Sequence, residues 1–149
     1  MKAKGYLFDL DGTMYNGTEP VKEAVDFVNR LQAEGIPYLF VTNNASMTAE
    51  AVAEKLRGMG VHSDAKHVLT SAMATGRYIA DLSPKARVYA IGETGLIDAL
   101  EREGLDVVAT EAADYVVIGL DRQITYEKLA VGALAIRAGA RFISTNGDI

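Results

Sequence analysis

The chain has 149 residues, of which 49% are hydrophobic and 23% are charged, a composition typical of a soluble globular protein and not of a disordered one. Its formal net charge of −5 argues against a generally basic surface for nucleic acid, and the absence of cysteine excludes disulfides, zinc–thiolate sites and a thiol nucleophile. No apolar run reaches the roughly 18 residues of a membrane span, and two acidic residues stand where a secretory signal has its apolar core, so we expect a cytoplasmic enzyme or binding domain.

The first half of the chain alternates short apolar runs with segments in which apolar residues recur at helical spacing. Strands are predicted at residues 6–10, 38–42 and 68–69, and helices at 21–31, 48–56 and 71–80. Pro20 suits the first turn of the first helix, where its missing N–H costs little, and Ser71 suits the N-cap of the third. Because a helix follows each strand, the pattern predicts a parallel sheet and an α/β fold.

The segment Leu82-Ser83-Pro84-Lys85 is the clearest candidate for a domain boundary, because the pattern of strand and helix restarts after it. Strands are then predicted at 88–91, 107–108, 115–118 and 142–144, and helices at 96–100 and 125–136, the second of them capped by Thr125. The sequence therefore predicts two domains, residues 1–81 and residues 82–149.

Two carboxylates follow the first predicted strand, in the segment Asp9-Leu10-Asp11-Gly12-Thr13. Ligands of open α/β sheets bind beyond the carboxyl ends of the strands, and the period of two turns Asp9 and Asp11 toward the same side. Gly12 permits a sharp turn after them. Such a pair can hold a hard cation such as Mg²⁺ through oxygen, or present one carboxylate as a nucleophile and the other as a proton donor.

A second polar group, Thr42-Asn43-Asn44, follows the second predicted strand. A hydroxyl and backbone N–H groups at that place can hold a phosphate without a full positive charge. Either motif alone is equally typical of an ordinary turn. Because neighbouring parallel strands would bring both motifs to one edge of the sheet, their combination favours a functional site.

The segment Phe8-Asp9-Leu10-Asp11-Gly12-Thr13 resembles the first motif of the haloacid dehalogenase superfamily, and Thr42 resembles its second motif. With Tyr15-Asn16-Gly17 and Phe40-Val41-Thr42-Asn43-Asn44, the chain is most similar to the NagD-like or 4-nitrophenylphosphatase-like branch. The resemblance implies a Rossmann-like parallel core, incomplete in this chain, with an inserted α/β cap. Residues 1–81 would be the N-terminal part of the core, and residues 82–149 most of the cap.

The resemblance also implies a mechanism and a cofactor. Asp9 would attack phosphorus to form an aspartyl-phosphate, and Asp11 would protonate the leaving oxygen and then activate water. Mg²⁺ would be bound by the Asp9 carboxylate and the Asp11 backbone carbonyl. Thr42 and the N–H groups of Gly12 and Asn43 would hold the phosphoryl group. The expected substrates are small phosphomonoesters of the sugar phosphate or nucleotide type, and not a nucleic acid polymer or a membrane.

Other implications of the resemblance concern the cap and the end of the chain. Asn44, Asp121 and Asn146 are candidates for contacting the substrate, and caps of this type often mediate homodimers. The family also needs a lysine and an acidic Gly-Asp cluster that follow the cap. Residues 147–148 only superficially resemble that cluster, and Lys85 is better explained as a surface lysine. We therefore expect a fragment of a longer enzyme, inactive or impaired by itself.

Two other functions fit a parallel α/β domain with acidic residues. A phosphoacceptor of the receiver type also binds Mg²⁺ through carboxylates, but it usually has adjacent acids after the first strand and its acceptor after a later one. A binding or assembly module that keeps the fold without chemistry is the third possibility.

Overall fold

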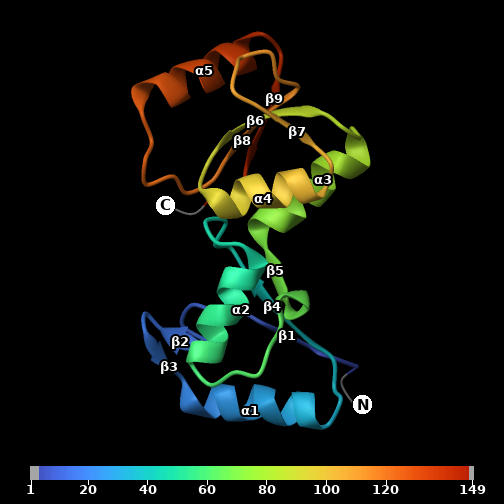
Figure 1. Ribbon diagram of the computed structural model, residues 1–149, viewed down its shortest axis with the longest axis vertical. Coiled ribbons are helices and arrows are strands. Elements are labelled where there is room, and N and C mark those ends of the chain that lie inside the picture. The colour runs from blue at the N-terminus through green and yellow to red at the C-terminus, as the bar shows by residue number, and fades with distance from the viewer. Residues whose placement is uncertain (1–3, 148–149) are drawn as a thin grey trace. The chain divides into compact units, whose positions relative to one another are not determined.

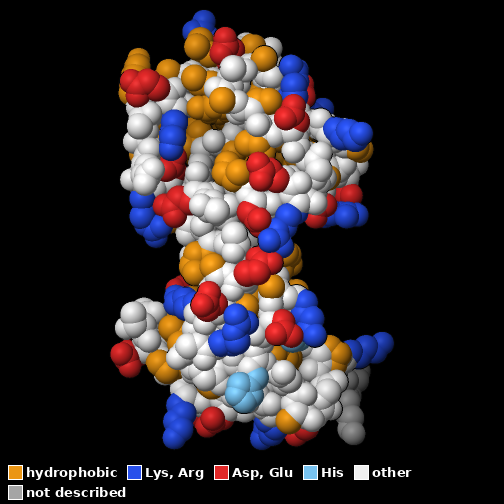
Figure 2. Space-filling model, viewed as in Figure 1, with side chains coloured by type: hydrophobic (Ala, Val, Ile, Leu, Met, Phe, Trp, Pro, Cys, Tyr) orange, Lys and Arg blue, Asp and Glu red, His pale blue; other side chains and the backbone are white. Residues whose placement is uncertain are grey.

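The computed structural model describes residues 4–147, and the chain divides into two compact units. Unit 1 comprises residues 1–42 and 49–69, and unit 2 comprises residues 43–48 and 70–149 (Figure 1). Between residues 4 and 147, no helix combines the length and the apolar character needed to cross a membrane. On the face drawn in Figure 2, basic and acidic side chains are interspersed over both units.

Unit 1 is built around a sheet with the strand order β1-β4-β5, flanked by a small hairpin and two helices. The elements are β1 (Tyr6–Phe8), β2 (Tyr15–Asn16), β3 (Glu19–Pro20), α1 (Lys22–Ala33), β4 (Tyr38–Thr42), α2 (Ala49–Gly58), a 3₁₀ turn (Ala65–His67) and β5 (Val68–Thr70). Strands β1 and β4 are parallel, with Phe8 opposite Phe40, so both strands end at the same edge of the sheet.

Helix α1 covers one face of this sheet with the apolar residues that its helical spacing brings together. The ring of Phe27 packs edge-on against the rings of Tyr6 and Phe8, with centroids 5.5 and 6.1 Å apart. Leu7 points to the opposite face, because successive strand residues alternate, and its side chain is 75% exposed. Strand β1 is an edge strand of the sheet that residues 4–147 form.

Unit 2 contains a four-stranded parallel sheet with the order β7-β6-β8-β9. Its elements are α3 (Ser71–Leu82), β6 (Arg87–Ile91), α4 (Thr94–Arg102), β7 (Asp106–Val108), β8 (Tyr115–Ile118), α5 (Tyr126–Arg137) and β9 (Arg141–Ser144). Val88 and Val117 pack into one core with residues of α3 and α4, and Tyr89 and Val116 pack into another with Ala135 of α5. The alternation along β6 and β8 therefore produces three layers, with helices on both faces of the sheet.

The predicted α/β class and the parallel strands are confirmed, but two local predictions are wrong. Pro20 ends the hairpin strand β3, and α1 begins only at Lys22 with Val21 as its N-cap. Strand β5 extends to Thr70, so Thr70, and not Ser71, caps α3, its hydroxyl accepting from the N–H of Met73 at 3.2 Å. The sequence pattern did not predict this hairpin, because each of its strands has only two residues, too few to show an alternation of apolar and polar side chains.

The contact boundary between the units differs from the expected one. It falls after Leu69, and α3 groups with the residues that follow it. The reason is packing: Ala72 and Ile79 of α3 share a buried core with Leu96 and Leu100 of α4. The assignment of the units to a catalytic core and a cap stays a prediction.

Candidate active site

The two acids lie immediately beyond the carboxyl end of β1. Strand β1 ends at Phe8, and the side chains of Asp9 and Asp11 are both exposed. Buried Leu10 anchors the turn between them. Its carbonyl oxygen accepts hydrogen bonds from the N–H groups of Thr13 and Met14, at 3.1 and 2.8 Å. Gly12 has a φ of 82°, a conformation that strains any residue with a Cβ. The turn thus presents both carboxylates to solvent.

The N–H of Gly12 is already used in this structure. It donates to the carbonyl oxygen of Tyr15 at 2.8 Å and thereby closes the turn. We expected this N–H to bind the phosphoryl group, but in this structure the Tyr15 carbonyl oxygen already accepts its hydrogen bond. What Gly12 visibly contributes is its backbone conformation.

Tyr15, which follows the first motif closely in the sequence, is a buried neighbour of these acids. It lies in β2, is only 3% exposed, and forms an isolated β-bridge with Asp11. Burial first, and then the charges of Asp11 and Asp9, raises the pKa of Tyr15 to about 12. The ammonium of Lys55 in α2 lies 3.7 Å from the centroid of the Tyr15 ring, a cation–π contact. The sequence signal for this proximity is the spacing: Tyr15 follows Asp11 by four residues, with Gly12 between them to allow a tight turn.

Thr42 reaches the same edge of the sheet from the neighbouring strand. It is the last residue of β4 and is buried. Because β1 and β4 are parallel neighbours in register, Thr42 and Asp9 come from strand ends that lie side by side in unit 1. Asn43 follows Thr42 in the chain but groups with unit 2, where its carbonyl oxygen accepts from the Ser71 hydroxyl at 2.8 Å.

The acidic side chains offer a partial shell for a metal ion. Across residues 4–147, no cluster of three or more His, Cys, Asp or Glu side chains has the geometry of a metal site. Two carboxylates with carbonyl oxygens beside them are nevertheless hard oxygen donors. Mg²⁺ is commonly held by one or two carboxylates, with water and substrate phosphate completing the shell. Asp9 and Asp11 fit that donor set.

The three candidate substrate contacts of unit 2 lie in two different cavities. Asn44 and Asn146 line one cavity of about 310 Å³, together with Leu120. Asp121 lines another, of about 560 Å³, where its carboxylate accepts from Lys128 Nζ at 2.6 Å. This hydrogen bond from Lys128 lowers the pKa of Asp121. Asp148, which only superficially resembles part of the acidic cluster, lies outside the described residues.

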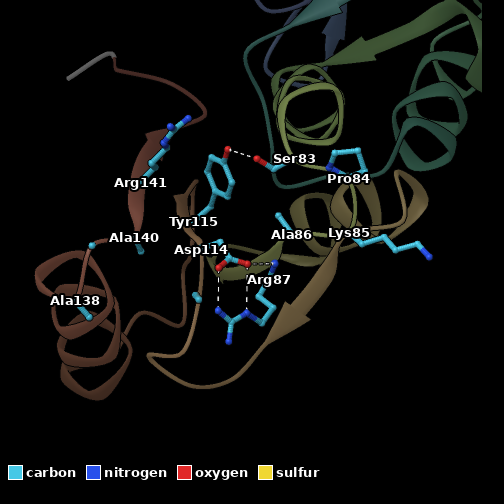
Figure 3. A pocket seen from close by; sticks show the side chains of 12 residues that line it. Ser83, Pro84, Lys85, Ala86, Arg87, Asp114, Tyr115, Ala138, Ala140 and Arg141 are labelled. Carbon is cyan, nitrogen blue, oxygen red and sulfur yellow. Dashed lines mark hydrogen bonds and ion pairs between the residues drawn. The ribbon is translucent and has the colours of Figure 1, made fainter.

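A larger cavity of about 630 Å³ lies at the other end of the strands of unit 2 (Figure 3). Its walls include the starts of β6, β8 and β9 and the C-terminal ends of α3 and α5, whose dipoles disfavour anions. The Asp114 carboxylate accepts three hydrogen bonds from Arg87 there, one from its backbone N–H at 2.8 Å and two from its guanidinium at 2.9 and 3.3 Å. Lys85 is exposed in its wall, as expected of a surface lysine.

The sequence profile of the family described as haloacid dehalogenase-like hydrolase matches residues 6–106. The chain belongs to this family. This confirms the family that the two motifs indicated.

Among curated relatives of this haloacid dehalogenase-like chain, the 5'-nucleotidase YutF of Bacillus subtilis is 58% identical over 146 residues. An acid sugar phosphatase of Staphylococcus aureus is 53% identical over the same length. The alignments cover 98% of this chain but only 57% and 56% of those proteins. The chain therefore spans little more than half the length of these relatives.

Solved structures show the same fold. The crystal structure of a p-nitrophenyl phosphatase described as putative, from Bacillus subtilis, is 57% identical and superposes with a TM-score of 0.92, covering 98% of this chain and 56% of that one. A glycerol phosphate phosphatase from Mycobacterium tuberculosis, crystallised in complex with magnesium, is 37% identical with a TM-score of 0.86, covering 97% of this chain and 44% of that one. The Rossmann-like α/β class is thereby confirmed.

Proposed function

We propose that this chain, as part of a complete haloacid dehalogenase-like hydrolase, hydrolyses small phosphomonoesters by way of an aspartyl-phosphate on Asp9. The observation that carries the proposal is the pair of exposed carboxylates, Asp9 and Asp11, beyond the end of β1, next to the strand that ends in Thr42. The names of the relatives, nucleotidase and phosphatase, support the same reaction class.

The two acids divide the chemistry between them. A carboxylate oxygen of Asp9 forms a bond to phosphorus while the bond from phosphorus to the leaving oxygen breaks, and Asp11 gives its proton to that oxygen. Asp11, now a carboxylate, then takes a proton from water as the water oxygen attacks phosphorus. Asp9 departs as a carboxylate, inorganic phosphate is released, and Asp11 is again protonated.

The phosphoryl group needs positioning as well as chemistry. The Thr42 hydroxyl and the Asn43 N–H are the proposed donors to its oxygens. Gly12 is proposed to shape the turn, and its N–H would join these donors only by releasing the carbonyl oxygen of Tyr15.

Magnesium is the proposed cofactor, held by the Asp9 carboxylate and the Asp11 backbone carbonyl. When bound, the ion neutralises the charge that otherwise keeps an anionic nucleophile from an anionic substrate. The magnesium complex of the Mycobacterium tuberculosis relative supports this proposal. The remaining ligands are expected from the segment that the longer relatives have beyond this chain.

The substrate is proposed to be a nucleotide or a sugar phosphate, since the relatives include a 5'-nucleotidase and an acid sugar phosphatase. Asn44 and Asn146, which share a cavity, are the proposed contacts to the leaving group. Asp121 is a second candidate from its own cavity. A homodimer formed through unit 2 and a cytoplasmic location remain predictions.

We expect this chain by itself to have a defect in catalytic turnover. Strand β1, which ends at the acids, is an edge strand among residues 4–147, and Leu7 on it is 75% exposed. An edge strand and an uncovered apolar side chain at the catalytic end leave the site poorly supported. We therefore expect little or no turnover from this chain alone.

The test compares two proteins with 4-nitrophenyl phosphate and Mg²⁺. One is this chain. The other, the extended protein, is this chain continued to the length of its relatives, with the continuation taken from its own gene or from the Bacillus subtilis relative. We expect turnover from the extended protein and its loss in Asp9→Asn, whose thermal unfolding should be unchanged because Asp9 is exposed. An active Asp9→Asn variant would refute the aspartyl-phosphate. A phosphoryl adduct that forms but is not hydrolysed would instead identify a phosphoacceptor.

A further inference from the structure

We propose that the cavity of unit 2 that contains Asn44 selects phosphomonoesters with an uncharged leaving group, and that Leu120 sets this selectivity. The inference rests on the proposed function and deepens it, because it states which leaving groups the hydrolase accepts. The cavity volume of about 310 Å³ is at the lower end of the range for small-molecule sites, about 300–1,000 Å³, and suits a leaving group. Its lining comprises Asn43, Asn44, Ala45, Leu120, Thr145 and Asn146.

Three segments of unit 2 form this cavity, and hydrogen bonds fix each of them. The N–H groups of Gly119 and Thr145 donate to the carbonyl oxygens of the last residues of β6 and β8, at 2.8 and 2.9 Å, and so continue the sheet. In the third segment, the side-chain oxygen of Asn44 accepts from the N–H and from the hydroxyl of Ser46, both at 2.8 Å. The walls of the cavity are therefore ordered by the fold of unit 2 itself.

The missing side chain at Gly119 lets the three segments approach one another closely. A Cβ at Gly119 would lie 3.1 Å from the hydroxyl oxygen of Thr145 and 3.4 Å from the Cβ of Ala45. The first distance is shorter than ordinary van der Waals contact, so even a methyl group would push the segments apart. Close packing at this point makes the cavity a preformed site, as small-molecule sites usually are.

Asn43 connects the cavity to the proposed phosphate site. It lines the cavity and directly follows Thr42, and its N–H is one of the proposed donors to the phosphoryl group. Its carbonyl oxygen accepts from the Ser71 hydroxyl at 2.8 Å, which fixes its backbone. Consecutive Cα atoms lie about 3.8 Å apart, so a phosphoryl group on these donors would lie within about one residue of the cavity.

The charge of the lining indicates which leaving groups fit. None of the described residues that line the cavity is ionisable. Asp121 follows Leu120 in the chain, but its carboxylate accepts from Lys128 Nζ at 2.6 Å and lines the other cavity. An anionic leaving group would lose hydration here without gaining a counter-charge. Hydroxyl and amide groups, in contrast, can pair with side-chain amides, which both donate and accept hydrogen bonds.

Leu120 supplies the large apolar side chain of the lining. It is 51% exposed, so much of its surface is available to the carbon atoms of a leaving group. Leucine offers a carboxylate no hydrogen bond. An arginine in its place would supply the missing counter-charge, and a guanidinium binds a carboxylate through two parallel hydrogen bonds. Replacing Leu120 by Arg should therefore relax the selectivity against anionic leaving groups.

The experiment measures kcat/KM of the extended protein for two substrates of nearly the same size. Glycerol 3-phosphate releases uncharged glycerol, whereas 3-phosphoglycerate releases glycerate, which has a carboxylate on the same carbon skeleton. We expect a preference for glycerol 3-phosphate of at least about tenfold. Leu120→Arg should reduce this preference about tenfold, mainly through a lower KM for 3-phosphoglycerate. Leu120→Lys, with the same added charge, is the second variant and should act in the same direction.

Two controls separate charge at this site from other effects. Leu120→Gln changes the size and polarity at the same position without adding charge, and it should change the preference less than about twofold. Leu134→Arg adds the same charge in α5, at a leucine that is also 51% exposed but does not line the cavity. It should leave the ratio of the two kcat/KM values unchanged.

Each other outcome overturns the inference in a recognisable way. Equal kcat/KM for both substrates, or a preference for 3-phosphoglycerate, would show that the cavity does not select against charge. A preference that neither Leu120→Arg nor Leu120→Lys reduces, or that Leu134→Arg reduces equally, would exclude Leu120 as its cause. In these cases turnover of 4-nitrophenyl phosphate would leave the proposed function standing. If the extended protein hydrolyses none of the three substrates, the proposed function itself is wrong, and the selectivity is overturned with it.

Discussion

Replacing Lys128 by Met should destabilise unit 2, because it leaves the buried carboxylate of Asp121 without its cationic partner. The Asp121 side chain is 3% exposed and accepts from Lys128 Nζ at 2.6 Å and from the Gln123 N–H at 2.8 Å. Removing one partner of a fully buried ion pair costs about 3–5 kcal/mol. Lys128 itself is 38% exposed, and the pair lies in the wall of an open cavity, so water screens it. We therefore expect a loss of about 1–2 kcal/mol in the free energy of unfolding at pH 7.

The pH dependence of the same variant provides the sharper assay. The hydrogen bond from Lys128 lowers the pKa of Asp121 in the folded protein. Its stabilisation is therefore present above the unfolded pKa of about 3.9 and is lost as the pH falls through the folded pKa. Urea unfolding followed by circular dichroism should show a difference between wild type and Lys128→Met that shrinks between about pH 5 and pH 3.

The control for this prediction is Arg77→Met, which removes an ion pair with Asp81, whose side chains are 67% and 60% exposed, and a second ion pair with Glu103, whose side chain is 31% exposed. Its cost should stay below about 1 kcal/mol. The reasoning is refuted if Lys128→Met costs no more than Arg77→Met at pH 7, or if its cost is the same at pH 3.

Further predictions concern the site at the end of β1 and β4. Gly12→Ala should destabilise the chain by about 1 kcal/mol, because Gly12 has a φ of 82°, and a thermal midpoint equal to wild type would contradict this. Thr42→Val in the extended protein should lower kcat at least about tenfold, whereas Thr42→Ser, which keeps the hydroxyl, should stay near wild type; equal effects would remove the hydroxyl from the mechanism. Chelation with EDTA should abolish turnover of 4-nitrophenyl phosphate and added Mg²⁺ should restore it, and activity that survives EDTA would argue against the cofactor.

The α/β class and the place of the acids could be read from the sequence because both depend on local patterns. The short apolar runs at residues 38–42 and 115–118 identify buried strands. The helices are identified by apolar residues that recur at helical spacing. Asp9 and Asp11 directly follow a predicted strand, so their place at a sheet edge needed only the parallel topology. The motif around them was also enough to indicate the family, which the profile match confirmed.

Other features depend on contacts between residues that no local pattern connects. The grouping of α3 with α4 arises from Ala72, Ile79 and Leu96 sharing one buried core, so the contact units divide before residue 70, whereas the sequence pattern restarts after residue 82. The separation of Asp121 from Asn44 and Asn146 likewise follows from how the loops of unit 2 fold.

By itself, the sequence determined which residues are available for chemistry, since carboxylates, a hydroxyl and a glycine turn have the same chemical capacity wherever the chain places them. Only the tertiary structure decided how those groups are partnered. The Gly12 N–H donates to the carbonyl oxygen of Tyr15, a residue that packing buries beside the turn. Hydrogen bonds require a donor and an acceptor within about 3 Å of each other, and that proximity is set by packing around the turn, which residue spacing does not specify.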